Sequence, residues 1–574
     1  MKNVFPFSRK TFMNNTYSYL GTGSFGGKAE GLKTLHEISA DENFNNYTNF
    51  KVTIPETIVI TTSCFDDFIE QNDLYPIALS NFDDSRIAHQ FQKASLPANI
   101  LGDLRAIASY IKTPIAVRSS SLLEDSAITP MAGMYATKMI PGNQPDANTR
   151  FLKLTEAIKL IYASTFFSGP KDSMTATEND IRDEKMAVII QNVAGLLHNR
   201  RFYPDISGVA RTYNYYPTGH SESSDGVISL ALGLGKFIVD GGNPWPFSPA
   251  YPSSPPLYNS VNDMIKNTQS YCWAINMESI KEYNPISESE FLRKLTLKEA
   301  EYDNSLKYAA STYDPYSDRL DSGISGKGPR IVTFAPILKN KELPLNEILI
   351  DLMEICKDKT ETQVEIEFAV TISRNPEIKN IFSMLQVRPL NISEEKISIN
   401  IANINKESII IKSLNSMGNG QIKNIKDIVY INPDDFNFKD SRIIAKEIEE
   451  LNKQMLINKR EYILIGFGRW GSSDPWLGIP VNWSMISNAG VIVEASLHGR
   501  PVDMSQGSHF FHNLTNLKIP YLCIDNNNDD DFLNWNWLNS ISKIKNQKIV
   551  KSITLEDPLK ILIDGKNHTG IIYK

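Results

Sequence analysis

The sequence has few cysteines and no long apolar run. Only four of its 574 residues are cysteines, and none form a CxxC pair: Cys64, Cys272, Cys356 and Cys523. Their spacing excludes a zinc ribbon and a disulfide framework, and it favours a reducing compartment. No apolar run of about 18 residues is present, and the N-terminal MKNVFPFSRKTFMNN lacks the apolar core of a signal peptide. We therefore expect a cytoplasmic protein with no membrane partner.

An excess of positive charge is also missing. Lys and Arg number 59 against 66 Asp and Glu, which gives a net charge of -7. We therefore expect no general nucleic-acid partner. The length leaves room for two to four domains, and a composition of 41% hydrophobic and 22% charged residues is that of a globular protein. These data leave the oligomeric state undefined.

The most informative stretch is Pro114–Thr137, where an apolar strand pattern, Ile115–Val117, changes abruptly to Arg-Ser-Ser-Ser. An arginine and hydroxyls at a strand end, followed by a small-residue loop, give fixed donors for an anion such as a polyphosphate. The planar guanidinium matches pairs of phosphate oxygens. The residues predicted to take part are Arg118, Ser119, Gly133 and Thr137.

A glycine-rich segment near the N-terminus predicts a second phosphate contact. Gly21, Gly23 and Gly26 fit G-x-G-x-x-G, and apolar residues at helical spacing follow, so a glycine turn opens an amphipathic helix with Lys28 at its start. The segment does not match the P-loop pattern, because Thr22 and Ala29 stand at two of its required positions. The sequence before the glycines is a poor strand, which disfavours a dinucleotide fold. A plain flexible turn is the other interpretation.

Strand and helix patterns then alternate, which predicts an α/β (α+β) fold class. Residues 52–69 indicate strand, turn, strand and helix, residues 86–112 indicate helix, and strands are expected from 186, 207 and 228. Gln191, at the polar end of one strand, either reads an adenine edge or caps the strand. Gly233 and Gly235 permit either close approach to a ligand or a tight turn. Residues 244–327 look irregular and carry no recognisable chemistry.

Two later strands place polar residues in matching pairs. In VEIEFAV the alternation puts Glu365 and Glu367 on one strand face, and in MLQVRP it aligns Gln386 with Arg388. Mg²⁺ binds few carboxylates and completes its octahedron with water and phosphate oxygens. We therefore expect Glu365, Glu367 and Gln386 as a Mg²⁺ site beside a phosphate-binding Arg388. A solvated strand face is the other interpretation of each pair.

The pattern changes again after Pro389. Residues 391–407 are predicted to be a polar linker, and a second unit follows from 408 to 574, with strands at YILIGF, GVIVEA and PYLCID. In SQGSHFFHNL a glycine turn leads into a helix that starts at His509, where the helix dipole favours a phosphorylated side chain. The alternatives for His509 are a capping or core role, or a metal pair with His512.

Taken together, the ordered segments GGKAEGL, IPETIVITT, AVRSSSLLED with AGMYAT, MAVIIQNV, SGVARTYN, LGLGKFIVDGG, VEIEFAV and MLQVRP resemble the phosphoenolpyruvate synthase and pyruvate phosphate dikinase family. The resemblance implies a two-lobed ATP-grasp domain over residues 1–390 and a swivelling phosphohistidine domain over 408–574. It implies that ATP and Mg²⁺ are cofactors and that His509, Arg118 and Arg388 are catalytic. It assigns phosphate contacts to Lys28, Arg118, Thr137 and Arg388, and it places Glu367 and Gln386 around metal and phosphate with Glu365 as their support. The motifs themselves add five nucleotide-binding candidates: Ser119, Gly133, Gln191, Gly233 and Gly235.

The sequence also departs from this family. Lys236 stands where the family has a glutamate, the lead-in to His509 is altered, and no pyruvate-binding barrel follows the second unit. We expect an ATP-dependent dikinase-type phosphotransferase that forms a phosphohistidine and AMP and passes the phosphoryl group to an unidentified acceptor. The alternatives are an ATP-binding sensor or assembly component without turnover, or an enzyme half completed by a partner chain. A dinucleotide-dependent enzyme ranks last.

Overall fold

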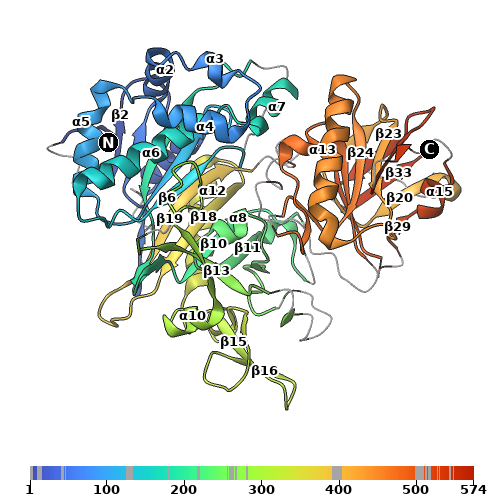
Figure 1. The fold of residues 1–574 in the computed structure, drawn as a ribbon. Helices are drawn as coiled ribbons and strands as arrows, with labels where there is room; N and C mark the ends of the chain where they lie inside the picture. Colours follow the sequence, from blue (N-terminus) through green and yellow to red (C-terminus); the bar gives the residue numbers. More distant parts are fainter. Residues whose placement is uncertain are drawn as a thin grey trace.

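The structure is a computed structural model of the chain (Figure 1). It describes residues 4–574 except 10–15, 40–43, 45–46, 125–132, 177–179, 216, 218–219, 255, 257–260, 262–263, 266–267, 280–281, 391–403, 473, 498–509, 511–513, 515–518, 527, 529, 542–544, 547–548 and 566. The predicted histidine His509, its neighbour His512 and most of the predicted linker lie outside these described residues.

The first lobe is a six-stranded sheet with helices packed around it. Its strand order is β1 (Phe5–Pro6), β2 (Tyr17–Leu20), β4 (Thr57–Ile60), β7 (Met186–Asn192), β5 (Ile115–Ser121) and β6 (Thr137–Ile140). The helices of this part of the chain are α2 (Thr62–Gln71), α3 (Tyr75–Ala78), α4 (Asp84–Lys93), α5 (Ala98–Tyr110), α6 (Ala147–Ser164) and α7 (Ser168–Ala176). The strands and helices expected between 52 and 112 are confirmed, except that Pro97, which caps α5, separates two helices.

The second lobe is another six-stranded sheet. Its order is β12 (Trp245–Phe247), β11 (Val227–Leu232), β10 (Ile206–Arg211), β18 (Val364–Thr371), β19 (Asn380–Pro389) and β3 (Phe50–Thr53). The alternation in β18 holds: Val364, Ile366, Phe368 and Val370 are buried in the main hydrophobic core. Helices α11 (Ala335–Leu338) and α12 (Leu345–Thr360) belong to the same part of the chain, and α12 packs against β18. Helix α1 (Gly27–Ile38) contacts both β5 and β19, so it connects the two lobes.

The segment 244–327 is more regular than its sequence indicates. Strands β13 (Tyr271–Asn276) and β14 (Leu292–Thr296) join β9 (Arg201–Tyr203) and β8 (Leu196–His198) in one sheet, and β15 (Ala310–Asp314), β16 (Arg319–Ser322) and β17 (Arg330–Val332) form another (Figure 1). This segment also contains the short helix α10 (Leu297–Tyr302), which starts at a Thr296–Glu299 capping box. The irregular prediction was wrong here because the strand pairing is with distant segments of the chain.

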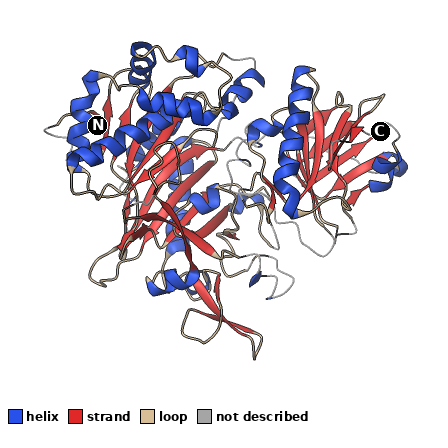
Figure 2. Cartoon of the chain, viewed as in Figure 1, coloured by secondary structure: helices blue, strands red, loops and turns tan. Residues whose placement is uncertain are grey.

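The C-terminal unit, residues 404–574, has its own hydrophobic cluster. Seven strands form its larger sheet, in the order β21 (Asn415–Met417), β28 (Tyr521–Ile524), β27 (Ala489–Ala495), β24 (Tyr462–Phe467), β23 (Asp427–Ile431), β31 (Val550–Thr554) and β30 (Lys545–Asn546). A second sheet contains β22 (Asn419–Ile422), β32 (Lys560–Asp564), β33 (Thr569–Tyr573), β20 (Ile409–Ser413) and β29 (Phe532–Leu533). Helix α13 (Ser441–Ile457) lies along the larger sheet, and the short α15 (Trp535–Ser540) lies near the C-terminus (Figures 1 and 2). The three strands predicted between 462 and 524 are confirmed.

All four cysteines are buried and none is in a disulfide, as their spacing predicted. Within the part of the chain that is described, no helix is long and apolar enough to cross a membrane.

Candidate nucleotide site

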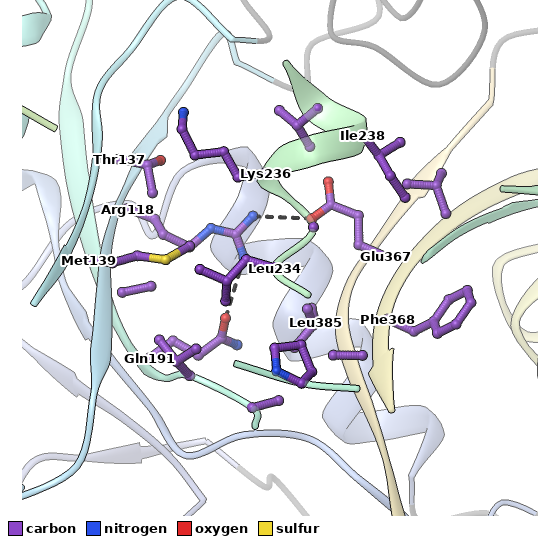
Figure 3. A pocket seen from close by; sticks show the side chains of 18 of the residues that line it. Arg118, Thr137, Met139, Gln191, Leu234, Lys236, Ile238, Glu367, Phe368 and Leu385 are labelled. Carbon is purple, nitrogen blue, oxygen red and sulfur yellow. Dashed lines mark hydrogen bonds and ion pairs between the residues drawn. The ribbon is translucent and has the colours of Figure 1, made fainter. Parts of the chain in front are cut away.

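A cavity of about 230 Å³ is lined by residues from both lobes (Figure 3). Strands β5, β6 and β7 of the first lobe and β10, β18 and β19 of the second contribute side chains to it. Seven of the residues predicted from sequence line it, namely Lys28, Arg118, Gly133, Thr137, Gln191, Gly235 and Glu367. The structure therefore brings together residues that are more than three hundred positions apart in the chain.

Arg118 is the residue that bridges the two lobes. From β5 its Nη1 donates to Gln191 Oε1 at 3.3 Å, and its Nη2 donates to Gln386 Oε1 at 2.7 Å and to Glu367 Oε2 at 3.4 Å. Figure 3 shows the guanidinium between Gln191 and Glu367. Since a guanidinium has five donors in a fixed fork, it can hold these partners and also face an anion in the cavity.

The predicted pairs on β18 and β19 lie in direct register. Glu365 pairs with Arg388 and Glu367 with Gln386 across the ladder. Arg388 Nε donates to Glu365 Oε1 at 2.6 Å, and Arg211 Nε donates to Glu365 Oε2 at 2.5 Å. Both oxygens of the buried Glu365 therefore accept from guanidinium groups. This carboxylate anchors two arginines, whereas we had predicted it as a metal ligand.

Lys28 is held in place by the close packing of α1 on β5. Gly26 precedes the helix with φ 74°, and a Cβ there would lie 1.9 Å from the Ser120 carbonyl oxygen, so only glycine fits. Lys28 Nζ then reaches Glu124 Oε1 at 2.5 Å and Ser119 Oγ at 3.3 Å. Ser119 is fully buried behind the lysine and does not line the cavity. The pairing of Lys28 with Glu124 was not predicted from the sequence.

Lys236, noted above as a departure from the family, lines the cavity together with two carboxylates that were not predicted, Asp240 and Glu288. Lys236, at the start of α8 (Lys236–Val239), is 3.1 Å from Asp240, and Glu288 lines the same cavity from the 244–327 segment. Burial raises the pKa of Glu288, while Lys236 and the Thr137 backbone N–H oppose that shift. Burial also raises the pKa of Asp240. No signal in the sequence around Glu288 distinguishes it from neighbouring surface glutamates.

The two predicted loop glycines differ in position. Gly235 lines the cavity, but Gly233 does not, because a Cβ on it would lie 2.8 Å from Cys272 Cβ and 2.9 Å from the Trp273 carbonyl oxygen. With φ 81°, Gly233 makes the tight turn that lets β13 pack closely. Of the two interpretations left open for Gly233, the structure supports the turn.

Most of the remaining cavity wall is apolar. A bulge in the β18–β19 ladder, between Glu367 and Phe368, leaves Leu385 as an extra residue that points into the cavity. Further apolar lining comes from Ala116, Met139, Val193, Pro204, Leu234, Ile238 and Leu292. A wall with a charged part and an apolar part suits a ligand with an aromatic base and a polyphosphate.

The described residues contain no cluster of three or more His, Cys, Asp or Glu side chains that forms a ready metal site. Glu367 is the carboxylate of the predicted set that lines the cavity, and the Gln386 amide oxygen lies across the ladder from it. One carboxylate with an amide oxygen fits Mg²⁺ that arrives with a phosphate ligand, because Mg²⁺ keeps water and takes phosphate oxygens as its other ligands.

The C-terminal unit contacts the rim of this site. Arg469 Nη1 donates to the Gly242 carbonyl at 2.6 Å, in the turn that follows Asp240, and Ser472 Oγ donates to the Gly241 carbonyl at 3.3 Å. Met134, next to Gly133, packs against the cores of both the first lobe and the C-terminal unit. The unit therefore docks beside the charged part of the cavity.

Three tryptophans lie in the segment 466–483 of the C-terminal unit. Trp470 and Trp483 are buried in the core of the C-terminal unit, and Trp476 is exposed. Phe510, the residue after His509 in the sequence, packs on Gly471 and on the Trp483 ring. Two of the three tryptophans therefore have a structural role in this unit.

The two six-stranded sheets and the cavity that they line belong to an ATP-grasp-like nucleotide-binding domain. Residues 22–408 match the family described as pyruvate phosphate dikinase, AMP/ATP-binding domain, and the chain belongs to this family. The predicted resemblance is thus confirmed, and ATP binding has the support of the family. No curated protein matches the chain.

Proposed function

We propose that the protein is an ATP-dependent phosphotransferase of the dikinase type, which forms a phosphohistidine and releases AMP. The observation that carries this proposal is the position of the Arg118 guanidinium. Arg118 belongs to the first lobe and lines the cavity, and its guanidinium contacts Gln386 and Glu367 of the second lobe. A cation at this junction would meet a polyphosphate that lies between the lobes, and it would neutralise charge that develops on the transferring phosphate.

The other charged residues take complementary parts in the proposal. Lys28 and Arg388 join Arg118 as phosphate-binding cations, and Ser119 and Glu365 position two of them from behind. Glu367 and Gln386 would hold Mg²⁺, whose chemistry is to bridge phosphate oxygens and withdraw charge from them. Gly133, Thr137, Gln191 and Gly235 contribute backbone and small polar contacts around the nucleotide.

The nucleophile in this proposal is His509. An imidazole nitrogen attacks the β-phosphorus of ATP, the bond from that phosphorus to the oxygen it shares with the α-phosphate breaks, and AMP leaves with that oxygen. Water then cleaves the β–γ linkage of the pyrophosphoryl-histidine, so that inorganic phosphate is released and the histidine retains one phosphoryl group. The histidine thus splits one transfer into two easier steps. Docking of the C-terminal unit at Gly241–Gly242 and Met134 supports delivery of this histidine to the charged part of the cavity. The segment 391–407 would serve as the linker about which the unit moves to an acceptor. The acceptor is a small molecule or a protein whose identity these residues do not define.

Product analysis tests the proposal. Full-length protein with Mg²⁺ and ATP should give AMP, resolved from ADP by chromatography, and His509→Ala should abolish AMP formation while ATP still binds. His89→Ala, an exposed histidine on α4, is the matched control and should retain full activity. Formation of ADP alone, or of AMP by His509→Ala at the parent rate, would contradict the proposal.

A further inference from the structure

Three of the described residues that line the cavity are carboxylates, and two of these have partners that account for their place. Glu367 accepts from Arg118 Nη2 at 3.4 Å, and Asp240 lies 3.1 Å from the Lys236 ammonium. The third carboxylate, Glu288, belongs to neither pair and comes from the connection between β13 and β14. A separate role in ligand binding is therefore open to it.

The connection that carries Glu288 is fixed to the first lobe by a buried ion pair. Lys138 Nζ on β6 is 2.6 Å from the Glu290 carboxylate, with side-chain exposures of 1% and 0%. The same ammonium donates to the backbone carbonyls of Pro285 at 2.8 Å and of Asn284 at 3.3 Å. Because loss of one partner from a buried ion pair is strongly destabilising, the backbone around Glu288 has a defined position beside β6.

The side chains of this connection divide between the first lobe and the cavity. Phe291, next to Glu290, is buried in the core of the first lobe, while Glu288 and Leu292 line the cavity. Leu292 begins β14, and the pairing of β14 with β13 fixes this end of the connection. Glu288 therefore reaches the cavity from a segment that is held on both sides.

The part of β6 that holds this connection spans the change from the charged to the apolar part of the cavity. The neighbours of Lys138 on the strand, Thr137 and Met139, both line the cavity. Thr137 pairs with Arg118 across the β5–β6 ladder, whereas Met139 pairs with Ala116 in the apolar wall. Because the segment of Glu288 is attached to Lys138, between these two levels, the carboxylate lies alongside this change.

A nucleotide in the cavity has its ribose at the same level. With the base on the apolar wall and the phosphates at the charged part, the sugar lies between the two. A carboxylate repels phosphate, but its two oxygens have about four lone-pair sites and suit the adjacent 2′ and 3′ hydroxyls of ribose as donors. The amino group of adenine is the other donor of ATP, and it belongs to the base, at the apolar wall.

We infer that Glu288 is a specificity-determining residue, which accepts hydrogen bonds from the ribose hydroxyls of ATP. The inference rests on the proposed function, because it takes ATP as the ligand of this cavity. Lys138 and Glu290 act as positioning residues, since they hold the connection that carries Glu288. Loss of a hydrogen bond to a charged group changes affinity by roughly ten- to a hundredfold, so ATP should bind at least about tenfold more tightly than 2′,3′-dideoxy-ATP.

Calorimetric titration with these two nucleotides tests the inference. Full-length protein carrying His509→Ala, which prevents turnover in the proposed reaction, is titrated with Mg²⁺-ATP and with Mg²⁺-2′,3′-dideoxy-ATP. The ratio of the two Kd values should be about ten or more, and the additional change Glu288→Ala should reduce it to less than about three. Loss of a negative charge from the cavity alters the binding of both triphosphates alike, so the ratio isolates the contact with the hydroxyls.

Two further variants sharpen the result. Glu282→Ala removes an exposed carboxylate of the same connection and should leave the ratio unchanged. If Glu288→Ala does not fold, Glu288→Gln keeps the shape of the side chain, removes its charge, and should lower the ratio by about threefold or more. Tight binding of ATP and its dideoxy analogue with equal Kd values would overturn this inference and leave the proposed function standing. A parent ratio that persists in the Glu288 variants would also overturn it, and no ATP binding at all would overturn both.

Discussion

Arg118 on β5 and Gln386 on β19 are 268 residues apart in the chain and are joined by a 2.7 Å hydrogen bond from Nη2 to Oε1. The same nitrogen lies 3.4 Å from Glu367. The Arg118 guanidinium thus connects β5 of the first lobe to β18 and β19 of the second lobe at the cavity. A change in this side chain should affect ligand binding more than it affects folding, since both lobes have their own cores.

Arg118→Lys keeps the charge but removes the planar fork that reaches Gln191, Gln386 and Glu367 together. The loss of a charged hydrogen bond should reduce transition-state stabilisation by about 2 kcal/mol. This corresponds to roughly a thirtyfold decrease in kcat/KM for AMP formation. Steady-state kinetics with varied ATP measures it. Arg105→Lys, an exposed arginine on α5, is the matched control. Parent kinetics for Arg118→Lys would mean that the guanidinium does not contact the nucleotide.

Glu365→Gln tests whether this carboxylate is an anchor. The change leaves Arg211 and Arg388 buried without their shared counter-charge, and it should lower the free energy of unfolding by about 3 kcal/mol. Urea denaturation measures the loss. Glu377→Gln, on an exposed turn between β18 and β19, should change the value by less than about 0.5 kcal/mol. Unchanged stability combined with lost Mg²⁺ dependence would instead make Glu365 a metal ligand.

Glu184 predicts a specific dependence of stability on pH. Burial raises the pKa of its carboxyl from 4.5 to about 7, so the folded chain holds a proton there at pH values where the unfolded chain has released it. The contribution of this carboxyl to the free energy of unfolding is fully present below pH 4.5 and is lost as the pH rises through 7. Glu184→Gln cannot titrate, so its stability lacks this dependence on pH. Between pH 4.5 and 8 its free energy of unfolding should rise by about 3 kcal/mol relative to that of the parent. Parallel stability curves for the two proteins would refute the assignment.

Arg469→Ala tests docking of the C-terminal unit. The variant loses the donor to the Gly241 and Gly242 carbonyls, so the docked arrangement should be less populated. Single-turnover formation of AMP should slow by about tenfold with the Kd for ATP unchanged, and small-angle scattering should show a larger radius of gyration. Arg442→Ala, exposed on α13, is the control. A weaker Kd with an unchanged radius would place Arg469 in nucleotide binding.

Much of the fold and part of the site follow from short-range patterns. Alternation on β18 and β19 predicted which polar residues share a face, and the structure pairs Glu365 with Arg388 and Glu367 with Gln386. Such predictions succeed because a strand's period of two is local and rigid. The bulge that turns Leu385 into the cavity was not predictable, since it depends on the register between two strands.

The features that were not predicted from the sequence depend on contacts between residues far apart in the chain. Glu288 reaches the cavity only because β13 and β14 pair with β8 and β9, and the pairing of Lys28 with Glu124 depends on the packing of α1 against β5. Nothing near either glutamate in sequence specifies these partners. The apparent irregularity of 244–327 has the same origin, because its short strands are stabilised by distant neighbours.

Labelling of the protein by ATP tests directly whether His509 receives a phosphoryl group. Parent chain is incubated with Mg²⁺ and ATP labelled separately at the β and γ phosphates, and its intact mass and acid lability are then measured. We predict an acid-labile gain of one phosphoryl group that carries the β label on the parent, absent from His509→Ala, together with release of AMP and of the γ label as inorganic phosphate. Tight ATP binding with no label on the protein and no AMP would contradict it.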